Sequence, residues 1–169
     1  MSGGSARSVR AAGVAIAMAI ALSSCNTLPN LPHDVGECGV ALVIWLRHPN
    51  AARYEYFTVD GGVFAYGAGR DALLLKTSWQ TDLSAEQCRS LSDIAQRGGW
   101  FTEGFTPPIA AAGDRSADCA VSWPGGRQQF VVQGVEPSLQ AATALLRAIA
   151  DVRFQPALDR LPEAGLQKK

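Results

Sequence analysis

The chain has 169 residues, of which 47% are apolar and 18% are charged, and its 15 Lys and Arg balance its 15 Asp and Glu. This hydrophobic content excludes a disordered chain, because disordered chains combine low hydrophobicity with high net charge, and the length suits one domain with a sizeable core. The zero net charge, without a basic cluster, also argues against a nucleic acid partner, since phosphate binding depends on grouped Lys and Arg.

The first 25 residues have the pattern of an export signal. Arg7 and Arg10 precede a stretch of 12 apolar or small residues at 11–22, and a Leu-Ser-Ser triplet leads directly to Cys25. A permanent membrane-spanning helix needs about 20 apolar residues, so a cleaved segment fits better. The alternatives are an ordinary secretory signal with a chance cysteine, or a short uncleaved anchor.

This pattern resembles the signal of bacterial lipoproteins over residues 1–25. In that family, the cysteine after such a triplet receives a diacylglycerol on its thiol and becomes the first mature residue, and Cys25 matches this position. The resemblance implies a protein held at the membrane by acyl chains rather than by a spanning helix. Asn26 stands where an Asp retains such proteins in the inner membrane, so the resemblance implies the outer membrane, facing the periplasm.

We divide the chain into four parts: a signal peptide at 1–24, a tether at 25–37, one domain at 38–162 and a C-terminal tail at 163–169. The tether contains two prolines and few bulky apolar residues. Such a segment suits an extended linker that lifts the domain off the bilayer.

The first half of the domain has the pattern of an antiparallel meander. Short runs of branched, aromatic or alternating residues are bounded by turn residues, and Asp60-Gly61-Gly62 can form a tight hairpin. We expect four strands, at residues 39–47, 53–59, 63–66 and 72–79.

Helix signals begin at Ser84, which is placed as an N-cap with Gln87 completing a capping box, and this helix ends at Gly98-Gly99. A second hairpin joins strands at 119–123 and 128–133. The last main helix starts at Pro137, and its apolar stripe is expected at Leu139, Ala142, Leu145, Leu146, Ile149 and Val152.

Strands and helices are segregated along the chain, which predicts an α+β fold: an antiparallel sheet made of a four-strand meander plus a hairpin, with two main helices packed on one face. Residues 59–101 resemble uncharacterised bacterial exported lipoprotein domains, in which a Gly-rich hairpin precedes a strand and a helix that starts with Leu-Ser. The shared motifs are turns and caps, so this resemblance implies a fold and no activity.

Three cysteines follow Cys25, and an exported compartment allows a disulfide to persist. The spacing leaves all three pairings open. Cys38 and Cys119 both stand at predicted strand starts and are our predicted pair, with three buried thiols as the alternative. The gaps of 50 and 31 residues around Cys88 do not fit a zinc site, which needs paired short spacings, so we expect no metal.

The sequence lacks the motifs of nucleophilic catalysis and of nucleotide binding. Its two histidines are His33, in the tether, and His48, at a strand end. Neither stands in a pattern that activates a nucleophile, and we expect no cofactor. Hydrolysis of cell-wall or glycan material by Asp and Glu needs no histidine and is the alternative function.

A loop that concentrates Trp100, Phe101 and Phe105 is the best candidate for a partner surface. If these aromatics are exposed, they would bind another envelope protein or a glycan, and if buried they close the core, which is the favoured interpretation. We therefore expect a non-enzymatic, lipid-anchored envelope protein that binds or scaffolds another component.

Overall fold

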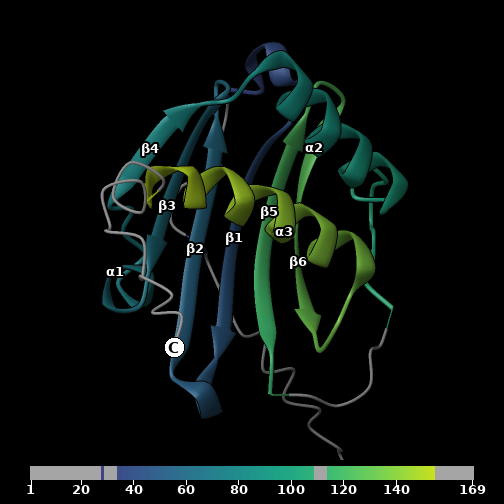
Figure 1. Ribbon diagram of the computed structural model, residues 1–169. Helices are drawn as coiled ribbons and strands as arrows, with labels where there is room; N and C mark the ends of the chain where they lie inside the picture. The colour runs from purple at the N-terminus through teal and green to yellow at the C-terminus, as the bar shows by residue number, and fades with distance from the viewer. Residues whose placement is uncertain (1–27, 29–33, 109–113, 155–169) are drawn as a thin grey trace, which may run out of the picture.

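A computed structural model describes residues 28, 34–108 and 114–154. These residues form an antiparallel sheet of six strands in the order β4-β3-β2-β1-β5-β6. Helices α2 and α3 lie in front of the same face of this sheet (Figure 1). The predicted α+β class with an antiparallel sheet is confirmed. Within the described ranges, no helix has both the length and the apolar character needed to cross a membrane.

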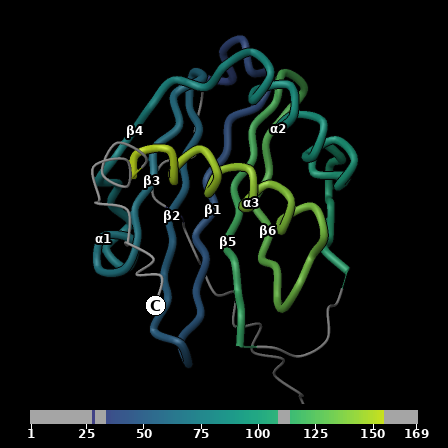
Figure 2. The backbone as a smooth tube through the Cα atoms, in the orientation of Figure 1, coloured from purple at the N-terminus to yellow at the C-terminus, as the bar shows by residue number. Residues whose placement is uncertain are grey.

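The strands are β1 (Ala41–His48), β2 (Arg53–Asp60), β3 (Val63–Ala68), β4 (Trp79–Asp82), β5 (Ser116–Trp123) and β6 (Gly126–Gln133). The α-helices are α1 (Arg70–Leu73), α2 (Ala85–Arg97) and α3 (Pro137–Asp151), and the short 3₁₀ helices are η1 (Gly36–Cys38), η2 (Pro49–Ala51) and η3 (Val152–Phe154). The β5–β6 hairpin joins the meander through β1, which pairs with both β2 and β5. Figure 2 shows the backbone of α3 crossing in front of the strands.

The packed part of the chain begins before the predicted domain boundary at residue 38. The backbone N–H of Gly61, in the β2–β3 turn, donates to the carbonyl oxygen of Asp34 at 2.7 Å, and the N–H of Asp34 donates to the Asp60 carboxylate at 3.0 Å. Leu28, also inside the predicted tether, is only 7% exposed. Asp34 and Leu28 therefore both contact the folded part of the chain.

The strand predicted at residues 72–79 is wrong. The chain forms the single helical turn α1 after β3, and pairing with β3 resumes only at Trp79. Ala and Leu are good helix formers, and a short apolar run fits either state. A side chain at Gly67 on β3 would collide with the carbonyl oxygen of Lys76, so the returning chain passes directly over β3 before it enters β4.

The predicted start of α2 is confirmed. The hydroxyl of Ser84 accepts a hydrogen bond from the N–H of Gln87 at 3.2 Å, and the Gln87 side chain accepts one from the N–H of Ser84 at 2.8 Å. Gly99 follows the helix with a φ of 75°, as expected for a glycine that ends a helix. The buried residues of α2 are Cys88, Leu91 and Ala95.

Helix α3 starts at Pro137 as predicted, and Glu136 is its N-cap. Glu136 is 5% exposed, and its carboxylate accepts hydrogen bonds from the backbone N–H groups of Ser138 and Leu139. The predicted apolar stripe ends before Val152, which is 66% exposed. Its buried members are Leu139, Ala142, Leu146 and Ile149.

The disulfide joins Cys38 to Cys88, whose Cα atoms are 4.6 Å apart, and Cys119 is a free, buried thiol. The predicted pairing of Cys38 with Cys119 is therefore wrong. Cys119 lies inside β5, directly opposite Ile44 of β1, whereas Cys38 precedes β1 and reaches the first turn of α2. The covalent link thus fixes the N-terminal segment to a helix instead of to a strand.

The sheet has a buried cluster on each face. The larger cluster fills the space between the sheet and the helices, and Trp100 and Phe57 are its largest fully buried side chains. The smaller cluster lies on the opposite face, as the alternation of β1 residues requires. Its buried members are Leu28, Val43, Tyr56, Ala72 and Ala120, and Trp45, Tyr54 and Leu75 pack against it.

Candidate functional site

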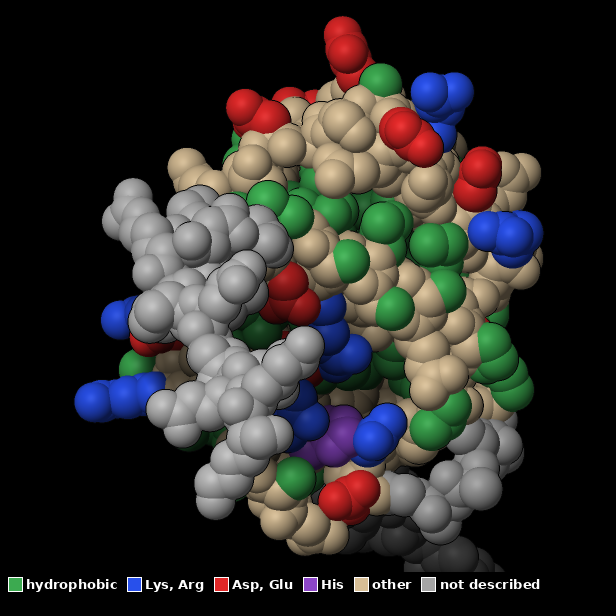
Figure 3. All heavy atoms as spheres, in the orientation of Figure 1, with side chains coloured by type: hydrophobic (Ala, Val, Ile, Leu, Met, Phe, Trp, Pro, Cys, Tyr) green, Lys and Arg blue, Asp and Glu red, His purple; other side chains and the backbone are tan. Residues whose placement is uncertain are grey.

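A pocket of about 250 Å³ lies between α3 and the adjoining ends of β1, β5 and β6. Its apolar lining includes Leu46, Ala117 and Leu139, and its polar lining includes His48, Arg115, Ser116, Gln140 and Thr143. In the space-filling view, a histidine lies among Lys and Arg side chains beside a hollow on this face (Figure 3). The pocket therefore combines apolar walls with hydrogen-bond donors.

Three elements far apart in sequence bring the polar groups of the pocket together. His48 ends β1 and lies opposite Arg53 of β2. Arg115 directly precedes β5, and its carbonyl oxygen accepts the N–H of Gly134 at 2.8 Å, which fixes its backbone against the end of β6. Helix α3 supplies Gln140 and Arg147, which lie on one helix face because they are seven residues apart.

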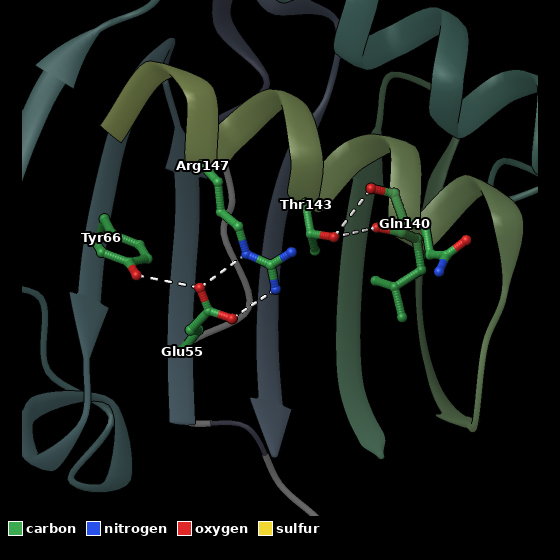
Figure 4. A network of polar contacts seen from close by, with 6 residues as sticks. Glu55, Tyr66, Gln140, Thr143 and Arg147 are labelled. Carbon is green, nitrogen blue, oxygen red and sulfur yellow. Dashed lines mark hydrogen bonds and ion pairs between the residues drawn. The ribbon is translucent and has the colours of Figure 1, made fainter. Parts of the chain in front are cut away.

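A network of hydrogen bonds among Glu55, Tyr66 and Arg147 joins α3 to the sheet beside the pocket (Figure 4). The guanidinium of Arg147 donates to both carboxylate oxygens of Glu55 on β2, at 2.9 and 2.6 Å. The hydroxyl of Tyr66 on β3 donates to the same carboxylate at 3.2 Å. Paired, two-point contacts of this kind are among the stronger hydrogen bonds in proteins, so the network fixes the position of α3 over β2.

The network changes the acidity of its members. Burial alone would raise the pKa of Glu55, but the hydrogen bonds and charge of Arg147, with help from Tyr66 and Arg53, outweigh it and hold that pKa below its usual 4.5. Burial, together with the Glu55 charge and hydrogen bond, raises the pKa of Tyr66 to about 12. At neutral pH, Glu55 is therefore a carboxylate and Tyr66 a neutral donor.

The three arginines in and around the pocket differ in their ion pairing. In the ranges that the structure covers, Arg115 and Arg53 form no ion pair, whereas Arg147 is paired with Glu55. The pKa of His48 is lowered below 6.5 by partial burial first and then by the charge of Arg115; Arg53 acts in the same direction, while Asp114 and Glu55 act against it. His48 is therefore mainly neutral at pH 7, and the positive charge of Arg115 acts on it.

The carboxylates of Glu136 in the pocket and of Glu55 beside it are already engaged in structural contacts. The Glu136 carboxylate caps α3, and the Glu55 carboxylate accepts from Arg147 and Tyr66. On the other face of the sheet, Arg47 donates to Asp118 at 2.6 Å. Among the described residues, no group of His, Cys, Asp and Glu side chains is placed to hold a metal ion.

The aromatic loop is mainly part of the core. Trp100 is 0% exposed, so its side chain offers nothing to a partner. Phe101 stacks on Trp123 with ring centroids 5.5 Å apart, and Phe105 meets the edge of Phe130 at 5.0 Å. The interpretation of this loop as a cover for the core is the one that its packing favours.

Sequence reasoning singled out His48 but missed the rest of the pocket. The recurrence of polar residues at Gln140, Thr143 and Arg147 is the signal that could have found the wall on α3, because this spacing marks one helix face. Arg115 carries no comparable local signal. Cys25 and His33 lie outside the described residues.

No family model matches this chain, and no curated protein is significantly similar to it. Function must therefore be inferred from the residues of the chain itself.

Proposed function

We propose that this protein is an exported binding module, anchored to the membrane by acyl chains on Cys25, that takes a small anionic ligand into the pocket beneath α3. The observation that carries the proposal is Arg115, which lines the pocket and has no ion-pair partner within the described residues. The proposed location is the outer membrane, with the domain facing the periplasm.

The Cys38–Cys88 disulfide supports export. Disulfides persist in secreted and periplasmic proteins and are rare in reducing compartments. A disulfide in the folded domain agrees with a signal segment that ends at Cys25. A short apolar signal and a structural disulfide are independent features, and both favour the same compartment.

The donors of the pocket favour an anion. An arginine presents five N–H donors in a planar fork and no acceptor, which suits carboxylate and phosphate groups. Of the acids around the pocket, Glu136 and Glu55 already accept two or more hydrogen bonds each, and Asp114, next to Arg115, is exposed. Neither the Glu136 nor the Glu55 carboxylate forms an ion pair with Arg115, so its guanidinium can pair with a ligand.

The volume and the apolar walls of the pocket restrict the size and polarity of the rest of the ligand. The pocket of about 250 Å³ is slightly smaller than the 300–1,000 Å³ typical of sites for drug-sized molecules. Leu46, Ala117 and Leu139 offer apolar contact beside the charged group. The expected ligand is a small molecule, or the end of a larger one, with an anionic head and a short apolar body.

The alternative of a hydrolase acting through Asp and Glu receives no support from the site. Its general acid would need a carboxyl group with a raised pKa. The Glu55 carboxyl has a lowered pKa instead, and the Glu136 carboxylate is held by the backbone of α3.

The anchor is tested by the mass of the native protein. Membrane-extracted protein should begin at Cys25 and carry the mass of a diacylglycerol on that residue. A chain that keeps its initiator Met1, or that lacks acyl mass on Cys25, would remove the proposed location.

The pocket is tested by ligand-dependent stability. Succinate or inorganic phosphate should raise the Tm of the protein, because a ligand that binds the folded state stabilises it, and the neutral diamide of succinate should not. Arg115→Gln should abolish the rise, and Arg127→Gln, at an exposed arginine on β6, should keep it. An equal response in the two variants would contradict the proposal.

A further inference from the structure

Two neighbouring leucines at the end of α1 are open to solvent. Leu73 is 51% exposed and Leu74 is 52% exposed. The buried side of the same turn is formed by Ala72, at 0% exposure, and by Leu75, which packs against the cluster on the back of the sheet. Ala72 and Leu75 supply the packing of this turn against the sheet. The side chains of Leu73 and Leu74 therefore remain available to contact a partner.

Charged residues flank this leucine pair in the sequence. Arg70 before it and Lys76 after it are both exposed, and the one acid in the segment, Asp71, is partly buried. Apolar side chains between exposed cations are the composition of segments that enter the headgroup region of a bilayer, where the cations meet anionic lipids.

The proposed lipid anchor is tied to the same part of the molecule. Leu28 belongs to the buried cluster that also contains Ala72, and it stands three residues after Cys25. Three residues of any conformation span at most about 11 Å, given a limit of about 3.6 Å per residue. The acyl chains on Cys25 must therefore enter the bilayer close to the back-face cluster, against which Leu75 also packs.

We propose that Leu73 and Leu74 rest in the surface of the bilayer that the Cys25 anchor enters, so that the domain lies flush against the membrane. The inference rests on the proposed lipid anchor and adds a second, protein-made contact to it. It replaces the predicted 25–37 tether, which would lift the domain away from the membrane. Because Leu28 is buried, only Asn26 and Thr27 stand between the anchored Cys25 and the packed chain.

The experiment uses the full lipidated protein in vesicles of phosphatidylethanolamine and phosphatidylglycerol that carry a photoactivatable acyl chain. Mass spectrometry of tryptic peptides locates the crosslinks. Lipid crosslinks should appear on residues 71–76, should be lost in a Leu73→Glu, Leu74→Glu double variant, and should remain in the control Val131→Glu, at an exposed valine on β6. Unchanged circular dichroism spectra would show that both variants are folded.

The outcomes separate this inference from the proposed function. Acyl mass on Cys25 with no lipid crosslink on residues 71–76, or with crosslinks that persist in the double variant, would overturn the inference and leave the anchor intact. A missing acyl mass on Cys25 would overturn both.

Discussion

Glu55 on β2 and Arg147 on α3 meet through two hydrogen bonds although 92 residues separate them in the sequence. The Glu55 side chain is 13% exposed and the Arg147 side chain 41% exposed, so the carboxylate is the more buried partner. This pair joins α3 to β2 beside the pocket, and Tyr66 on β3 donates to the same carboxylate.

Loss of the Glu55 charge should destabilise the protein in a pH-dependent way. Glu55→Gln should lower the free energy of unfolding at neutral pH by about 1–2 kcal/mol, toward the low end for hydrogen bonds to charged groups because Arg147 is partly exposed. The folded pKa of Glu55 lies below 4.5, so the stabilisation is present above that pH and is lost as the pH falls through the folded pKa. Urea unfolding at pH about 7 and at pH about 3.5 measures both effects.

The Glu55→Gln variant should therefore lose less stability than the wild type on acidification. Asp93→Asn, at an exposed carboxyl on α2, is the matched control and should behave as the wild type. Equal acid sensitivity of wild type and Glu55→Gln would show that the ion pair does not stabilise the fold.

The Cys38–Cys88 disulfide should make a large contribution to stability. It closes a loop with a sequence separation of 50 residues, and the chain-entropy relation gives about 4 kcal/mol for a loop of this size. A Cys38→Ala, Cys88→Ala double variant should unfold at a correspondingly lower urea concentration. Cys119→Ala keeps the disulfide and should cost less, and the reverse order would contradict the assignment.

The Cys119 thiol should be unreactive toward alkylating reagents in the folded protein. Burial, with added effects of Asp118 and Glu136, raises the pKa of its thiol, and the thiolate is the reactive form. Iodoacetamide should not modify Cys119 until a denaturant is added, as read from the mass of its peptide. Rapid labelling of the native protein would show that β5 opens readily.

Trp100 should be required for the fold rather than for binding. Trp100→Ala removes a fully buried side chain and should lower the free energy of unfolding by about 3–5 kcal/mol. Phe101→Ala, at a partly exposed ring stacked on Trp123, should cost clearly less. Denaturant unfolding of the two variants compares them, and similar losses would mean that the loop packs differently.

The His48 imidazole should report on the occupancy of the pocket. Its pKa should lie below 6.5 in the free protein, and Arg115→Gln should raise it because the charge of Arg115 is one cause of the lowered value. Phosphate bound in the pocket should raise it too, since a nearby anion favours imidazolium. NMR titration can follow the two histidines separately, and a His48 pKa that phosphate leaves unchanged would place the anion elsewhere.

Local chemistry made some elements predictable. The Ser84–Gln87 capping box and the glycine after α2 depend on residues within one or two helical turns, and the structure contains both. The run at Ala72–Leu75 carries no such signal, because a short apolar run fits helix and strand alike. The close approach of Lys76 to Gly67 is visible only in the tertiary structure.

Features that depend on tertiary packing were harder to predict. The disulfide partner of Cys38 is set by how η1 and α2 pack, which no strand pattern reveals. The pocket likewise joins the end of β1, the start of β5 and one face of α3. Among the residues that line it, the sequence draws attention only to His48 as a candidate for chemistry. Arg115 becomes a candidate only once the pairing of β5 with β1 is known.

The disulfide also makes a covalent ring that contains β1, β2, β3 and β4. A protease that cuts once inside this ring cannot release a fragment, because the two pieces stay joined through sulfur. On a gel, the nicked chain would keep the mobility of one polypeptide until a reductant is added. A protein that resides among extracellular or periplasmic proteases would thus survive single cleavages in the exposed turns of its meander.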